Sequence, residues 1–252
     1  MKIDLNADLG ESFGPWVMGH DDDMLGLVTS ANVACGGHAG DPETMFATLT
    51  RAAALGVSVG AHPGYADRQG FGRRIIPMST GEITRMVTAQ IGALVGMASL
   101  AGARVAYVKP HGALSNLASR DAAVSGAICD AVAAFDPALA FLAISGTQME
   151  HVAKARGLTV YSEIFADRAY QDDGQLVPRG TPGAVLHDAD EAADRLVGFL
   201  KTGRMPVLGG GDIALDAHSI CVHGDNPAAV DTARQIRAAL AAEGVTLAPF
   251  LA

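Results

Sequence analysis

Short apolar segments with strand character alternate along this chain with longer segments that carry helix signals. The predicted strands lie at residues 3–9, 31–35, 57–61, 105–108, 140–144, 158–164, 206–208 and 219–222. Because helical stretches separate most of them, the alternation favours parallel strands joined by helical crossovers. The chain is therefore expected to be an α/β protein, a closed or nearly closed β/α barrel of about seven strands, with a doubly wound open sheet as the alternative.

Capping residues mark the helix boundaries. Asp41 is suited to cap a helix that begins at the following proline and runs to Leu55. The segment from Ser79 to Glu82 matches a capping box before a long helix that ends near Gly102. Further helices are expected over 147–156, 188–202 and 227–243. The sequence has no tandem repeat, low-complexity tract or obvious linker, so we expect a single domain over residues 1–252.

Composition excludes several classes of protein. Apolar residues make up 49% of the 252 residues and charged residues 18%, which is typical of a globular chain. A formal net charge of −9, without a basic cluster, argues against a nucleic-acid surface. The start, MKIDLNADLGE, has no apolar signal region, and no apolar run is long enough to span a bilayer. Three dispersed cysteines predict no disulfide framework and no C-x-x-C zinc site. A cytoplasmic protein is expected.

Ionisable or polar side chains occur at or just beyond the ends of most predicted strands. In chain order these residues are Asn6, Asp8, Glu11, His38, His62, Lys109, His111, Glu163, Asp167, Arg168, His223 and Asp225. In a parallel β/α barrel the carboxyl ends of all strands lie on one face. At least six separate segments would therefore bring these groups to one basin. Each residue alone has a structural explanation, as a cap, a turn residue or a surface ion pair, and the repetition favours a site.

The chemistry of such a basin is acid–base and electrophilic. Asp8 and Glu163 can activate water or transfer protons, and histidines can do the same near neutral pH. Cationic side chains can hold a substrate carboxylate or a phosphoryl group, the candidates being Lys109, Arg73, Arg74 and Arg168. Asp8, His38 and His62 can also bind a metal that keeps an open position for water. Their spacing does not decide this, because all three come from different strands.

Neither common nucleotide-binding pattern is present. No G-x-G-x-x-G follows the first strand, and G-x-x-x-x-G-K-[ST] occurs nowhere in the chain.

Seven blocks of the sequence resemble the signature of one known family. They are KIDLNADLGESFG, SANVACGGHAGDP, GAHPGYADRQGFGRR, VKPHGAL, EIFADRAY, LVPR and ICVHGDNP, between residues 2 and 227. The chain is similar in these blocks to the LamB/YcsF family, whose characterised members form one subunit of bacterial 5-oxoprolinase. The resemblance implies a single seven-stranded (β/α) barrel of the glycoside hydrolase/deacetylase type. It also implies ATP-dependent opening of 5-oxo-L-proline to L-glutamate, with ADP and phosphate as products, magnesium accompanying the ATP, and partner subunits B and C.

Motif position and chemistry together give the expected site. Catalytic roles are expected for Asp8, His38, His62, Lys109 and Glu163. Substrate or phosphate binding is expected for Asn6, Glu11, Arg73, Arg74, His111, Asp167, Arg168, His223 and Asp225. No protein-bound metal is firmly predicted, and Asp8, His38 and His62 are the candidate ligands if one is present. Two alternatives stay open: a metal-dependent deacetylase or amidohydrolase that uses no ATP, and a non-catalytic component that binds a lactam or carbohydrate.

Overall fold

The structure is a computed structural model that describes residues 1–222 and 229–251. The predicted site residues His223 and Asp225, and the start of the helix expected at 227, lie outside the described residues.

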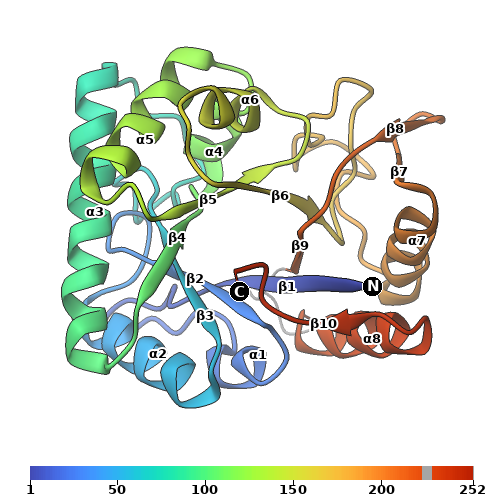
Figure 1. Cartoon of the computed structure of the whole chain (residues 1–252), viewed down its shortest axis with the longest axis horizontal. Coiled ribbons are helices and arrows are strands. Elements are labelled where there is room, and N and C mark those ends of the chain that lie inside the picture. The colour runs from blue at the N-terminus through green and yellow to red at the C-terminus, as the bar shows by residue number, and fades with distance from the viewer. Residues whose placement is uncertain (223–228, 252) are drawn as a thin grey trace.

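Seven parallel strands form a closed barrel at the centre of the molecule (Figure 1). In order around the barrel they are β1 (Lys2–Leu9), β2 (Ser30–Ala34), β3 (Ser58–His62), β4 (Val105–Val108), β5 (Ala140–Ile144), β6 (Val160–Phe165) and β9 (Ser219–Val222). The barrel closes where β9 pairs with β1, with Ile220 opposite Leu5. A short strand, β10 (Thr246–Leu247), adds to the start of β1. The closure confirms the predicted barrel and excludes the open sheet.

Helices surround the barrel and connect its strands. They are α1 (Asp21–Leu25), α2 (Pro42–Leu55), α3 (Thr80–Ala101), α4 (Gly112–Ala118), α5 (Ala122–Phe135), α6 (Gln148–Ala155), α7 (Ala189–Thr202) and α8 (Ala229–Ala242). The predicted caps are present: the Asp41 carboxylate accepts from the backbone N–H of Thr44 at 2.8 Å, and Ser79 and Glu82 form the capping box of α3. Figure 1 shows α2, α3 and α5 along one side of the barrel, with α7 and α8 on the other.

Two features differ from the sequence-based expectation. The strand expected at 206–208 is not part of the barrel. It corresponds to β7 (Arg204–Pro206), which pairs antiparallel with β8 (Asp212–Ala214) in a separate hairpin. Three consecutive glycines at 209–211, all with positive φ, form its turn, a geometry that suits a hairpin and not a helical crossover. In addition, α1, α4 and α5 occupy stretches for which no helix was expected.

The alternation of side chains along β1 explains why the barrel interior is polar. Successive side chains of a strand point to opposite faces. The odd positions, from Ile3 to Leu9, join the apolar core that packs against the helices. The even positions, Asp4, Asn6 and Asp8, instead bond to partners on other strands of the barrel. The interior is therefore a place where buried polar groups must satisfy one another.

One helix among the described residues, α3, is long and apolar enough to cross a bilayer by length and composition. It packs against α2 and α5 in the outer layer of the barrel. Its buried apolar residues, Ile83, Val87, Ile91, Leu94 and Ala98, recur every three or four positions and so form one face. The apolar character of α3 is thus explained by its packing on the domain.

Candidate functional site

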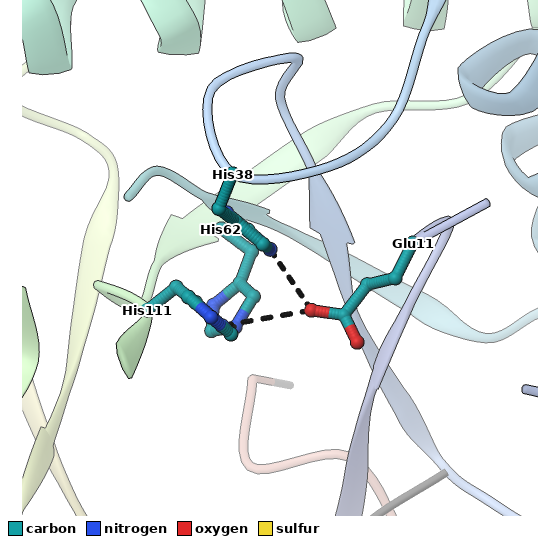
Figure 2. A group of neighbouring side chains, drawn as sticks. All are labelled: Glu11, His38, His62 and His111. Atoms are coloured by element: carbon teal, nitrogen blue, oxygen red, sulfur yellow. Dashed lines mark hydrogen bonds and ion pairs between the residues drawn. The ribbon is translucent and has the colours of Figure 1, made fainter. Parts of the chain in front are cut away.

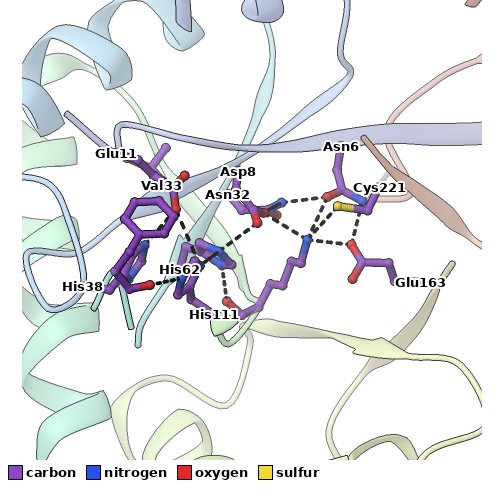
Figure 3. A network of polar contacts seen from close by, with 12 residues as sticks. Asn6, Asp8, Glu11, Asn32, Val33, His38, His62, His111, Glu163 and Cys221 are labelled. Atoms are coloured by element: carbon purple, nitrogen blue, oxygen red, sulfur yellow. Dashed lines mark hydrogen bonds and ion pairs between the residues drawn. The ribbon is translucent and has the colours of Figure 1, made fainter. Parts of the chain in front are cut away.

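A buried lysine lies at the centre of the polar network inside the barrel mouth. Lys109 follows the last residue of β4 and is 4% exposed. Its ammonium nitrogen lies 2.8 Å from Oε1 of Glu163, 3.0 Å from Oδ1 of Asp8 and 3.2 Å from Oδ1 of Asn6. Figure 3 labels these three acceptors. The thiol sulfur of Cys221 lies 3.2 Å away on a further side. Strands β1, β6 and β9 thus all present a group to this one cation.

A second tier of side chains holds the acceptors of Lys109 in place. Asn32 on β2 donates to Oδ1 of Asn6 at 2.7 Å and to Oδ1 of Asp8 at 2.9 Å. The hydroxyl of Tyr107 donates to the side-chain oxygen, Oδ1, of Asn32 at 2.7 Å. Asn6 also donates to Glu163 at 2.9 Å. Because these groups are buried and mutually bonded, the positions of both carboxylates beside Lys109 are fixed.

Three histidines and a glutamate form a cluster beside this network. Nε2 of His38 lies 2.9 Å from Oε1 of Glu11, and Nδ1 of His111 lies 3.5 Å from the same oxygen (Figure 2). Nδ1 of His111 also lies 3.0 Å from Nε2 of His62. One nitrogen or oxygen from each of the four residues lies within 4.8 Å of the others, so the cluster could hold a metal ion.

Close backbone packing positions the histidine rings. The rings of His38 and His111 stack at 3.6 Å between centroids, nearly parallel. The loop after β3 covers them: a Cβ on Gly72 would lie 2.6 Å from Cβ of His38, and Gly72 has a φ of 61°. The preceding Phe71 also has a positive φ, of 53°, and its carbonyl accepts from Nε2 of His111 at 2.9 Å. Glycine at 72 is therefore required by both the backbone angle and the space.

Opposing effects set the ionisation of the Asp8–Lys109 pair. Burial alone would raise the pKa of the Asp8 carboxyl, but His62 and Lys109 beside it outweigh burial and hold this pKa well below its usual range. Burial likewise opposes the charge on Lys109, yet Asp8, together with Cys221 and Glu163, keeps the pKa of its ammonium well above the usual value. At neutral pH the pair is a carboxylate facing an ammonium.

The other ionisable groups respond mainly to burial. Burial raises the pKa of Glu163, and Lys109 only partly offsets the effect. Burial lowers the pKa values of His38 and His111 well below that of a free histidine. Deeper in the barrel, burial raises the pKa of Asp4 to about 6, against hydrogen bonds from Ser219 and two other hydroxyls. The site therefore combines a charged pair with groups that favour their neutral forms.

A cavity of about 780 Å³ opens above the network. Asp8 and Lys109 contribute to its floor, and arginines are present on its walls, namely Arg73, Arg120, Arg168 and Arg179. Arg168 is only 5% exposed, donates to the Val177 carbonyl at 2.7 Å, and has a pKa lowered by burial to about 10, so it keeps its charge at neutral pH. The cavity can accept a small anionic molecule beside the Asp8–Lys109 pair.

Comparison with known proteins assigns the chain to a family. The model of the LamB/YcsF family matches residues 3–252. The chain belongs to the LamB/YcsF family. Among curated proteins it is 53% identical over 245 residues to the A subunit of 5-oxoprolinase from Gluconobacter oxydans, covering 97% of this chain and 96% of that protein. It is 52% identical over 250 residues to the A subunit of 5-oxoprolinase from Paracidovorax citrulli, covering 99% and 100%.

A solved structure supports the same relationship. The crystal structure of a lactam utilization protein from Thermus thermophilus superposes with a TM-score of 0.93 and 44% sequence identity. The match covers 98% of this chain and 99% of that one. The two chains thus share their whole fold.

Most of the residues expected from the sequence meet in this LamB/YcsF barrel. The two connected groups contain Asn6, Asp8, Glu11, His38, His62, Lys109, His111 and Glu163. Arg73 and Arg168 line the cavity above them. Arg74 and Asp167 lie outside the set of described residues that line it, and Arg74 forms an ion pair with Asp67. Of the three expected metal ligands, His38 and His62 belong to the four-residue cluster, and Asp8 contacts it through His62 at 3.2 Å.

Sequence reasoning missed the polar residues within the strands. Asn32, Tyr107, Ser219 and Cys221 all bond to the network, yet none lies beyond a strand end. The signal that could have revealed Asn32 and Ser219 is a polar residue inside a fully buried strand, since such a residue needs buried partners.

Proposed function

We propose that this chain is the lactam-opening subunit of an ATP-dependent 5-oxoprolinase, which converts 5-oxo-L-proline to L-glutamate with ADP and phosphate. The proposal is carried by one observation: an ion-paired Asp8 and Lys109 form part of the floor of a cavity whose wall bears a buried Arg168. The names of the relatives, the A subunit of 5-oxoprolinase and a lactam utilization protein, support the choice of substrate.

The chemistry explains why ATP would be needed. A lactam is a poor electrophile, and transfer of a phosphoryl group to its carbonyl oxygen makes the ring carbon far more reactive. Water then adds to that carbon, and the carbon–nitrogen bond breaks as the nitrogen takes a proton. The resulting acyl phosphate is hydrolysed by a second water to the carboxylate and phosphate. This sequence requires a base, a stabilising cation and an anchor for the substrate's own carboxylate.

The cavity residues are suited to these three needs. Asp8 is ionised and lines the cavity, which suits a base that takes a proton from water. Lys109, also at the floor, can stabilise negative charge on the phosphoryl group or on the carbon's oxygen. Glu163 lies beneath it and holds the ammonium in position at 2.8 Å. Arg168 and Arg73 are placed to pair with the substrate carboxylate.

We further propose that subunits B and C of the complex deliver or complete the site for ATP and its magnesium ion. The chain carries neither common nucleotide-binding pattern, which supports a site shared with partners. Long loops at the mouth, such as the arginine-containing segment 68–77, are candidates for that contact. A requirement for ATP is consistent with a cytoplasmic reaction.

A reconstitution assay tests this proposal. The purified chain, alone or mixed with candidate subunits B and C, is given 5-oxoproline and ATP, and the release of glutamate and ADP is followed. We expect turnover only in the full mixture, and its loss with Lys109→Met. The matched control is Lys201→Met, which removes a surface ammonium paired with Glu243. Sustained turnover by the lone chain would refute the shared ATP site, and no turnover by the mixture would refute the function.

A second function is favoured by the histidine cluster. Three imidazoles and a carboxylate beside a cavity suit metal-assisted hydrolysis of an amide without ATP. Omitting ATP from the reconstituted mixture separates the two functions, since only a metal-dependent hydrolase would continue to release glutamate. The non-catalytic alternative is separated by Asp8→Asn, which would leave the activity of the mixture unchanged if this chain only bound the lactam.

A further inference from the structure

In two of the clustered histidines, the ring nitrogen that points away from the cluster is hydrogen-bonded to a backbone carbonyl oxygen. Nδ1 of His62 lies 2.7 Å from the carbonyl oxygen of Lys109, and Nε2 of His111 lies 2.9 Å from the carbonyl oxygen of Phe71. A carbonyl oxygen can only accept, so each of these nitrogens carries the proton. In neutral rings the inward nitrogens, Nε2 of His62 and Nδ1 of His111, then have lone pairs. These two nitrogens face each other at 3.0 Å.

The nearest groups around these lone pairs are also acceptors. Oδ2 of Asp8 lies 3.2 Å from Nε2 of His62, and Oε1 of Glu11 lies 3.5 Å from Nδ1 of His111. The two lone pairs that face each other repel, and the two carboxylates beside them bring no donor to this contact. A cation between them removes this conflict, either a proton on His62 or a metal ion. A proton on Nε2 of His62 would serve Asp8 and His111, whereas a metal ion would also contact Glu11 and His38.

We propose that Glu11, His38, His62 and His111 bind one divalent transition-metal ion of the zinc class. A tetrahedral ion with bonds of the usual zinc length holds its ligand atoms about 3.3 Å apart. Three contacts of the cluster, at 2.9, 3.0 and 3.5 Å, bracket that spacing, and the remaining pairs lie within 4.8 Å. Imidazole nitrogens with one carboxylate favour zinc, cobalt or iron over magnesium or calcium.

The surroundings of the cluster match those of metal ligands. Histidine ligands typically donate their second ring N–H to a carbonyl, which fixes the ring and its tautomer, and His62 and His111 both do so. Glu11, His62 and His111 also line the cavity, so the ion would be reachable by a molecule bound there. His38 is 1% exposed and closes the buried side.

Metal titration of the isolated chain tests this site. The protein is stripped with a chelator, and Zn²⁺, Co²⁺ and Mg²⁺ are titrated separately by calorimetry. Visible absorption reports the geometry of bound Co²⁺. We expect one Zn²⁺ or Co²⁺ per chain, a tetrahedral cobalt spectrum, a higher Tm with Zn²⁺, and much weaker binding of Mg²⁺. The readout needs neither partner subunits nor ATP, so its failure is distinct from failure of the proposed function.

Two variants remove a ligand with little change of shape. Glu11→Gln is nearly isosteric. His111→Gln keeps an N–H that can donate to the Phe71 carbonyl while removing the inward nitrogen. Each is expected to weaken Zn²⁺ binding by at least about 100-fold, since even changes to supporting residues cost 10–100-fold. The control is His187→Gln, which changes an exposed histidine and should bind like the wild type.

Three results would overturn the proposal. The first is wild-type protein that binds neither Zn²⁺ nor Co²⁺, which would leave a proton on His62 as the shared cation. The second is Zn²⁺ affinity equal in wild type and Glu11→Gln. The third is equal weakening in His187→Gln, which would place the ion elsewhere. Circular dichroism checks folding, and if His111→Gln does not fold, Glu11→Gln carries the test.

Discussion

Replacement of Lys109 by methionine should destabilise the protein in a pH-dependent way. The substitution keeps an apolar stem and removes the ammonium that lies 2.8 Å from Glu163 and 3.0 Å from Asp8. Asp8 retains contacts with His62 and Asn32. Glu163 retains the amide of Asn6 on Oε1, while its Oε2 has no hydrogen-bond partner among the described residues. Of the two carboxylates, Glu163 therefore loses the larger share of its polar contacts when the ammonium is removed.

The size of the effect follows from the burial of this pair. Removing one partner of a buried ion pair typically costs about 3–5 kcal/mol, because the other charge stays buried. Lys109 and Glu163 are 4% and 0% exposed, so solvent screens little of the loss. We therefore expect the free energy of unfolding of Lys109→Met to fall by about 3–5 kcal/mol at pH 8.

The loss in free energy of unfolding caused by Lys109→Met should be smaller at acid pH. Burial already raises the pKa of Glu163, and loss of the ammonium raises it further. A carboxyl whose pKa is higher in the folded state is favoured there while protonated, and this stability is lost as the pH rises through the folded pKa. The difference between wild type and variant should thus be smaller at pH 5 than at pH 8, as measured by urea unfolding monitored by circular dichroism.

A double variant provides the control. Lys109→Met with Glu163→Gln has no unpaired carboxyl at position 163, so it should be more stable than the single variant at pH 8 and less dependent on pH. The reasoning is refuted if the deficit of the single variant is the same at both pH values. It is also refuted if the double variant is no more stable than the single one.

Other substitutions give separate tests. Asp8→Asn should lower turnover of the reconstituted enzyme by at least about 100-fold. The Tm should change little, because Lys109 keeps its ion pair with Glu163. A lower Tm with full activity per folded molecule would make Asp8 structural. The pKa of Asp4 rises from 3.8 to about 6 on folding, so the contribution of Asp4 to wild-type stability declines as the pH rises across that window. Asp4→Asn should flatten this decline, which urea unfolding at several pH values measures. Gly60→Ala, whose Cβ would overlap the Tyr107 ring, should cost at least about 2 kcal/mol in urea unfolding, whereas Gly96→Ala in an open helix position should gain about 0.5–1 kcal/mol.

The barrel could be predicted from sequence because its strands are short, apolar and regularly separated by capped helices. The caps at Asp41 and Ser79 form the bonds that their residue types predict. The stretch from 112 to 135 was missed for a physical reason. Helix α5 buries a nearly continuous run from Val124 to Val132, so its sequence lacks the 3.6-residue alternation by which surface helices are recognised.

The sequence predicted those site residues whose positions are determined by the end of a strand. His38 and His111 follow β2 and β4, His62 is the last residue of β3, and barrel geometry alone brings them together. The orientation of a loop side chain is less constrained. Arg73 and Arg74 are adjacent in sequence, yet one lines the cavity and the other pairs with Asp67. The sequence pattern cannot separate them, since the choice depends on how the loop turns.

Strand β1 explains why two groups of polar residues lie side by side in one barrel. Its inward positions descend in steps of two residues, so Asp8, Asn6 and Asp4 lie at successive depths. Gly10, with a φ of 69°, then turns the chain at the mouth and brings Glu11 to the histidines. Asp8 is the residue that touches both groups, since one carboxylate oxygen faces Lys109 and the other faces His62. The ammonium and the histidine cluster therefore share one carboxylate, and any cation held by the histidines acts directly on the base of the proposed reaction.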